Sequence, residues 1–211
     1  MRKAQLEGVP AECTLIVATG DGLAADLETA LWAKGLIPLS ETPEVPFDVI
    51  LISARDLQIF QAHHTLTDLA ASGLPLIGGA SVDWPSIAPL QVTSCNRTRI
   101  AFLGLTSLGE HSDPLTTVKK HVSKARHQSD IIILLSNLGL PEERRIAREV
   151  KDIDIILDSG RALDQPEKVQ DTLLVPQKFP GRSVTMLRLV FNRDGELKQY
   201  QIKNLFFFPP S

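Results

Sequence analysis

The chain has 211 residues, a hydrophobic content of 43% and a formal net charge of −3, which are ordinary values for a globular protein of one large domain or two small ones. Its 22 Lys and Arg residues are scattered rather than gathered in a basic stripe, so the sequence gives no indication of nucleic-acid binding. No apolar run reaches about 18 residues, so no membrane-spanning helix is predicted.

The first half of the chain alternates short apolar runs with stretches of helical periodicity. Residues 14–19, 47–53 and 75–81 have the apolar, partly β-branched composition of buried strands. Apolar residues recur at helical spacing over 23–35 and over 56–72. This alternation is typical of a layered α/β domain.

The second half opens with a predicted β-hairpin over 89–107, whose turn contains Asn96. A helix is predicted over 114–128, because Asp113 is placed to cap it and Pro114 stands in its first turn. A strand, a helix and a further strand follow at 130–136, 141–150 and 153–158. The remaining strands are predicted at 172–177, 184–191 and 197–208.

These elements predict a single domain over residues 1–211, with 1–13 as a lead-in and 206–211 as a terminal tail. Strands and helices alternate up to about residue 157, and a β-meander follows. The late strands are expected to form a second sheet packed on the first.

The two cysteines, Cys13 and Cys95, stand at the edges of apolar runs. We expect two free, half-buried thiols, which is the ordinary state of such residues, while a disulfide stays open for an exported protein. Neither has a second Cys or a His at zinc spacing, so no structural zinc is predicted.

Five segments of the second half share their order, spacing and hydrophobic pattern with a known family. They are RIAFLGLT (99–106), SDIIILLSNLG (129–139), IDIILDSGRA (153–162), DTLLVPQ (171–177) and VTMLRLVFNRDGEL (184–197), preceded by TLIVATGD (14–21) and FDVILISARDLQ (47–58). The series resembles the catalytic domain of the 5′-nucleotidase family of calcineurin-like metallophosphoesterases, which includes related thiosulfohydrolases. The resemblance implies an α/β (layered α+β) fold, a two-sheet β-sandwich flanked by helices and truncated at the N-terminus.

Enzymes of this family hold two metal ions with Asp, His and Asn side chains at strand ends, and the metals activate water and bind phosphate oxygens. Asp21 matches the acidic residue that bridges the metals and is the one retained ligand candidate. The other family-site positions hold poor or impossible ligands, namely Ala54, Arg55, Gln58, Asn137, Gly160 and Ala162. The resemblance therefore implies a degenerate domain without metal cofactors, a binding or structural module rather than an enzyme. The nucleoside-binding second domain of the family is not expected within these residues.

Arginines stand at or beside former metal positions, where a guanidinium could replace a metal cation. Arg55, Asn137, Arg161 and Lys178 are a candidate site for a phosphate- or sulfate-like anion. Structural ion pairs or solvated loop arginines are the commoner alternative.

Two further functions stay open. One is a metal-dependent phosphoesterase with a rebuilt site, using divalent metal ions held by Asp21, Asp56, Asn137, Asp158 and His63 or His64. The other is an α/β ligand-binding domain outside the family. A dinucleotide site is not favoured, because Ala25 replaces the third glycine of the fingerprint that would begin at Gly20.

The terminal run Phe206–Phe208 needs burial, so it is a candidate contact for a protein partner or a second copy of the chain. The compartment stays open. The first 13 residues lack the apolar core of a signal peptide, so the chain either stays in the cytoplasm or has lost a leader, and the family resemblance favours an exported or periplasmic protein.

Overall fold

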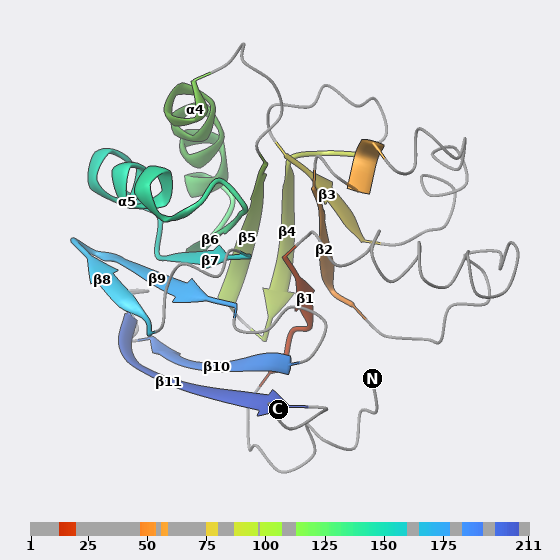
Figure 1. The fold of residues 1–211 in the computed structure, drawn as a ribbon, viewed down its shortest axis with the longest axis vertical. Helices are drawn as coiled ribbons and strands as arrows, with labels where there is room; N and C mark the ends of the chain where they lie inside the picture. The colour runs from red at the N-terminus through yellow and green to blue at the C-terminus, as the bar shows by residue number, and fades with distance from the viewer. Residues whose placement is uncertain are drawn as a thin grey trace, which may run out of the picture.

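The structure is a computed structural model, and it describes residues 13–19, 47–53, 56–58, 75–79, 87–96, 98–106, 113–159, 165–177, 183–191 and 197–206. Within these ranges the chain forms a six-stranded sheet, a three-stranded sheet, a two-stranded sheet and two helices of more than one turn (Figure 1). None of the helices in the described ranges is long and apolar enough to span a bilayer.

The six-stranded sheet has the order β4-β5-β6-β7-β9-β8. Strands β5, β6, β7 and β9 run parallel, whereas β4 and β8 are antiparallel edges. The strands are β4 (Leu90–Cys95), β5 (Thr98–Leu105), β6 (Ile131–Ser136), β7 (Ile155–Asp158), β8 (Glu167–Val169) and β9 (Thr172–Pro176). The predicted β4–β5 hairpin is confirmed, and Asn96 in its turn adopts a left-handed φ of 57°, which asparagine tolerates.

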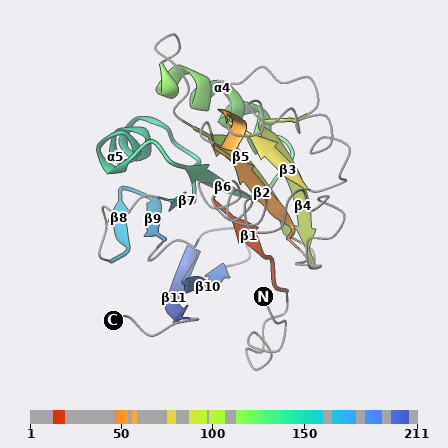
Figure 2. The same cartoon turned by 45° about the vertical axis from the view of Figure 1, so that its right-hand side comes forward.

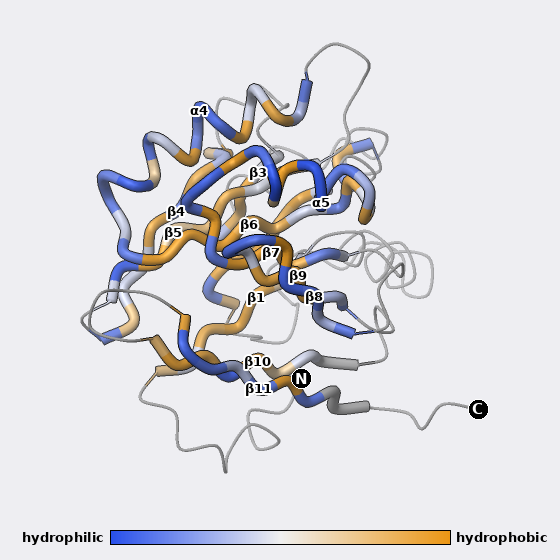
Figure 3. Tube along the Cα trace, turned by 90° about the vertical axis from the view of Figure 1, so that its left-hand side faces the viewer, coloured by the Kyte–Doolittle hydropathy of each residue, from blue (hydrophilic) through white to orange (hydrophobic). Residues whose placement is uncertain are grey.

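Two helices cover one face of this sheet: α4 (Pro114–Arg126) and α5 (Leu140–Glu149) (Figure 3). The predicted cap of α4 is confirmed, since the Asp113 carboxylate accepts a hydrogen bond from the Thr116 backbone N–H at 3.1 Å. The helix α5 begins after Gly139, whose φ of 90° suits glycine.

The opposite face packs against a three-stranded parallel sheet in the order β1-β2-β3 (Figure 2). Its strands are β1 (Val17–Ala18), β2 (Val49–Ile52) and β3 (Leu76–Gly78). The sheets approach closely at Gly104, where an added Cβ would lie 2.3 Å from the Gly78 carbonyl oxygen.

The strands β10 (Ser183–Phe191) and β11 (Leu197–Phe206) form an antiparallel pair on the same side as the three-stranded sheet (Figure 3). Between this pair and the six-stranded sheet lies a cluster of buried apolar residues that includes Leu51, Phe102 and Ile133, which we call the inner apolar cluster. Leu187, Leu189 and Ile202 of the pair pack against it.

Adjacent residues along the central strands point to two different cores, as expected for strands buried on both faces. Ala101, Leu103 and Leu105 of β5 face the helices, whereas Ile100 and Phe102 face the other two sheets. The helix-flanked two-sheet architecture implied by the family resemblance is therefore confirmed.

Three expectations need correction or fall outside the described ranges. The strand β9 joins the six-stranded sheet rather than a second sheet, and β8 was not predicted because its three residues, EKV, carry no apolar run. The two cysteines are not free thiols: Cys13 and Cys95 form a disulfide. The helix predicted over 23–35, and most of the one over 56–72, lie outside the described residues.

Candidate functional site

The carboxyl ends of the parallel strands meet at one edge of the molecule. The register aligns Leu105 with Ser136, Ser136 with Asp158, and Asp158 with Pro176, so β5, β6, β7 and β9 end side by side. In an α/β sheet, this edge is where ligands bind.

Backbone hydrogen bonds continue past these strand ends and fix the residues that follow. The Ser159 N–H donates to the Ser136 carbonyl at 2.9 Å, and the Gln177 N–H donates to the Asp158 carbonyl at 2.8 Å. The Asn137 N–H makes a longer bond to the Leu105 carbonyl, at 3.4 Å.

The three-stranded sheet ends at the same place. The hydroxyl of Thr19, after β1, hydrogen-bonds to the side-chain oxygen of Gln177, after β9. Gly79, after β3, lies against Thr106, after β5, so closely that an added Cβ would be 2.8 Å from the Thr106 backbone nitrogen. The ends of both sheets therefore lie side by side at this edge.

Buried polar side chains gather at these ends, and we call them the strand-end polar layer. Its members are Thr19, Ser53, Asp56, Thr106, Ser136, Asp158 and Ser159, each at most 8% exposed. A fold gains nothing in stability by burying polar groups that apolar ones could replace. Such a layer therefore indicates a site rather than ordinary core packing.

Asp56 has a structural task in this layer. Its carboxylate accepts a hydrogen bond from the Ser53 N–H at 2.9 Å, and its own N–H donates to the Ser53 hydroxyl at 3.1 Å. This reciprocal pair is a capping box, which starts a helix at the end of β2.

Glu143 of α5 reaches the strand-end polar layer from the helical side. Glu143 and Asp158 are both fully buried, and burial, together with the negative charge of Asp158, raises the pKa of Glu143 to about 8. The hydroxyl of Ser136 opposes this shift only in part. Near neutral pH the two carboxyl groups therefore hold one proton between them.

Sequence reasoning missed Glu143, although a signal was present. Leu140, Glu143 and Ala147 follow one another at spacings of three and four residues on the buried side of α5. A carboxyl group in such a stripe is expected only where another group receives it.

The predicted site residues are only partly described. Asn137 lies half-buried directly after β6, and Gln58 lies exposed in the helical turn after β2. The other family-site and anion-site positions lie outside the described residues, namely Asp21, Ala54, Arg55, Gly160, Arg161, Ala162 and Lys178, as do His63 and His64.

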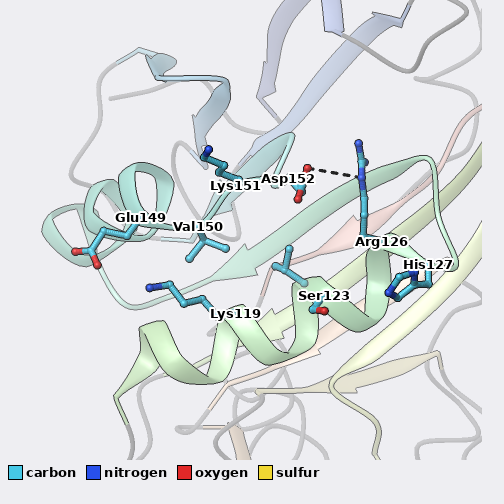
Figure 4. A pocket seen from close by; sticks show the side chains of 9 residues that line it. Lys119, Ser123, Arg126, His127, Glu149, Val150, Lys151 and Asp152 are labelled. Atoms are coloured by element: carbon cyan, nitrogen blue, oxygen red, sulfur yellow. Dashed lines mark ion pairs between the residues drawn. The ribbon is translucent and has the colours of Figure 1, made fainter.

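A concave region lies away from the strand ends, between the C-terminal half of α4 and the turn after α5 (Figure 4). It has a volume of about 350 Å³ and a mixed charge, with Lys119 and Lys151 on its rim and an ion pair of 3.7 Å between Arg126 and Asp152. No residue predicted for a site lines it.

Comparisons with known proteins bear on the family. No family model matches the chain. An uncharacterized metallophosphoesterase of Bacillus subtilis (strain 168), YunD, is 38% identical over 100 residues, which are 42% of this chain and 22% of that protein. The chain thus spans about a fifth of the length of this relative.

Two solved structures, both of Thermus thermophilus proteins, share the fold. The sulfate thiohydrolase SoxB has a TM-score of 0.69 at 16% identity, over 91% of this chain and 38% of that one. A 5′-nucleotidase precursor has a TM-score of 0.64 at 18% identity, over 93% of this chain and 46% of that one. The chain therefore has the fold of these 5′-nucleotidase-like proteins, and part of its sequence is similar to that of a metallophosphoesterase.

The described residues of the chain do not supply the donors of a two-metal centre. Such a centre needs several carboxylate or imidazole ligands. Within the described ranges, no three His, Cys, Asp or Glu side chains lie close enough together to hold a metal ion. Asn137 stands where the family motif has a ligating His, and Asp56 is engaged in the capping box. The described residues alone therefore do not hold two metal ions.

Proposed function

We propose that this chain is a non-catalytic 5′-nucleotidase-like domain that acts as a binding or structural module. The observation that carries the proposal is the set of residues at the family's ligand positions. Where the family motifs have imidazoles, this chain has Arg55, Asn137, Gly160 and Ala162. Hydrogen and methyl side chains cannot ligate a metal, and a guanidinium repels one.

We propose an anion as the ligand, bound by Arg55, Asn137, Arg161 and Lys178. Each arginine follows a member of the strand-end polar layer by two residues, Ser53 in one case and Ser159 in the other. The Ser159 hydroxyl is buried without a hydrogen-bond partner among the described residues, which supports a role in holding a ligand.

Metal analysis and a phosphatase assay test the absence of catalysis. The purified chain, incubated with Mn²⁺ or Zn²⁺ and desalted, is expected to retain less than one equivalent of metal and to leave p-nitrophenyl phosphate and AMP intact. More than one equivalent of tightly bound metal, or turnover of either ester, would overturn the proposal.

Calorimetric titration with inorganic phosphate and with sulfate tests the anion site. Arg161→Ala is expected to weaken binding at least about tenfold, the loss of a charge-assisted contact. The matched control is Arg148→Ala, because Arg148 is an exposed arginine on α5 outside the site. If both variants bind the anions with equal affinity, Arg161 does not belong to the proposed site.

The alternative is a metal-dependent phosphoesterase with a rebuilt site, and one observation favours it. Asp158 is a fully buried carboxylate in the strand-end polar layer, two residues before the family-site position Gly160. Asp21→Ala separates the two functions. If the site is rebuilt, the substitution abolishes metal binding and turnover. If the domain is non-catalytic, the parent chain shows neither, so the substitution changes neither.

We further propose that the protein is exported, because disulfides persist mainly in oxidising compartments and Cys13 is bonded to Cys95. As a structural module it would contact a protein partner or a second copy through Phe206–Phe208. Light scattering of the chain with and without residues 206–211 tests this contact. If the measured mass of the full chain stays that of one copy at every concentration, the tail does not join two copies of the chain.

A further inference from the structure

The disulfide joins the two sheets at their outer strands. Cys13 lies just before β1, the edge of the three-stranded sheet, and Cys95 is the last residue of β4, the edge of the six-stranded sheet. The bond closes a loop across a sequence separation of 82 residues, and that loop contains β1, β2 and β3.

Apart from this bond, a short ladder at the edge of its sheet holds β1 in place. It contributes two residues to the ladder, pairing Val17 with Val49 and Ala18 with Ile50. Before the ladder, the Ile16 N–H donates to the Asp48 carboxylate at 2.7 Å, and the Ile16 carbonyl accepts hydrogen bonds from the N–H groups of Asp48 at 2.8 Å and Val49 at 3.4 Å. A strand of two residues at the edge of a sheet opens more readily than a central strand.

The β1 segment covers part of the inner apolar cluster and reaches the candidate site. Leu15 and Val17 pack against the inner apolar cluster, and Cys95 packs against the same cluster from β4. The far end of the segment places Thr19 on Gln177 in the candidate site. Release of residues 13–19 would therefore open one side of this core and remove one member of the strand-end polar layer.

We propose that the Cys13–Cys95 disulfide is a redox latch that holds the β1 segment, residues 13–19, onto the body of the domain. A dithiol reductant supplies two electrons and two protons, the S–S bond becomes two thiols, and the reductant is oxidised to its own disulfide. The β1 segment then detaches. The six-stranded sheet stays folded, because its other core is built with α4 and α5 and contains no residue of β1.

Hydrogen exchange measured by mass spectrometry on the whole chain, with and without dithiothreitol, tests the latch. The sequence has 2 cysteines, so the reductant acts on one bond. Reduction is expected to speed exchange of the amides of 15–18 at least about tenfold, while those of 131–136 and 155–158 change less than about twofold.

Three results would overturn the proposal. The first is the presence of two free thiols in the protein denatured without reductant. The second is unchanged exchange of the amides of 15–18 on reduction. The third is loss of protection in β6 and β7 as well, which would mean that the bond stabilises the whole domain. The double variant Cys13→Ser/Cys95→Ser serves as a second measurement. It should match the reduced protein and show no response to dithiothreitol, and unfolding of the whole variant would again contradict a local latch.

Discussion

Glu143 and Asp158 place two buried carboxyl groups against each other at the end of β7. Asp158 thus brings a second carboxyl group to the strand-end polar layer, next to that of Glu143. One proton shared by two carboxyls leaves a single negative charge in the pair. This limits the repulsion that an anion bound nearby would meet.

The pH dependence of stability follows from the sign of this shift. The pKa of Glu143 is about 8 in the folded chain, against 4.5 for an ordinary Glu. Between these values the folded state holds a proton that the unfolded state has lost. The free energy of unfolding therefore falls as pH rises, by at most about 1.4 kcal/mol per pH unit. The contribution is complete below about pH 4.5 and is lost as pH rises through about 8.

Glu143→Gln is expected to remove this fall, because the amide stays neutral at every pH. Urea unfolding between about pH 5 and 9 measures it, and above about pH 8 the variant should be more stable than the parent chain. The control is Glu149→Gln, a half-exposed residue of the same helix, which should keep the parental slope. Parallel slopes for Glu143→Gln and the parent would contradict the shared proton.

At the scale of the elements, the close approach of the two sheets depends on glycine. A Cβ on Gly104 would lie 2.3 Å from the Gly78 carbonyl oxygen and 2.9 Å from Leu51 Cδ1, distances that real Cβ atoms do not show. The backbone of β3 cannot yield without disturbing its ladder with β2.

Gly104→Ala is therefore expected to lower the free energy of unfolding by about 1–3 kcal/mol, the usual cost of overpacking. Chemical denaturation measures the change. Ser123→Ala, on the exposed side of α4, is the matched control and should change stability by less than about 0.5 kcal/mol. A neutral Gly104→Ala would mean that the sheets are not packed as described.

Elements with a strong local pattern were predictable, whereas their pairing was not. The run Ile131–Ser136 is apolar on both faces and predicts a buried strand, and Asp113 with Pro114 predicts the start of α4. The place of β9 in the six-stranded sheet, and the bond between Cys13 and Cys95, depend on contacts distant in sequence. Local periodicity contains no information about either.

The candidate site shows the same limit. Sequence alone places small and polar residues after β6 and β7, and the family resemblance names Asn137 among them. The sequence could not show that Glu143 of α5 contacts Asp158, because this contact depends on how α5 packs on the sheet.

As a whole molecule, the chain has two cores separated by the six-stranded sheet. The helices close one core, whereas the three-stranded sheet and the β10–β11 pair close the other (Figure 3). Among the described residues, no helix packs on the β10–β11 pair, so its attachment to the domain depends on the side chains that it packs against the inner apolar cluster.

Leu187→Ala should show this dependence. Leu187 is half-buried against the inner cluster, so losing its side chain is expected to lower the free energy of unfolding by about 1–3 kcal/mol. Arg188→Ala changes the adjacent residue, whose side chain is exposed, and should cost less than half as much. Urea denaturation compares the two variants, and binding of a hydrophobic dye should rise only in Leu187→Ala, where part of the inner core becomes accessible. Equal costs for the two would mean that the pair lies on the domain without closing its second core.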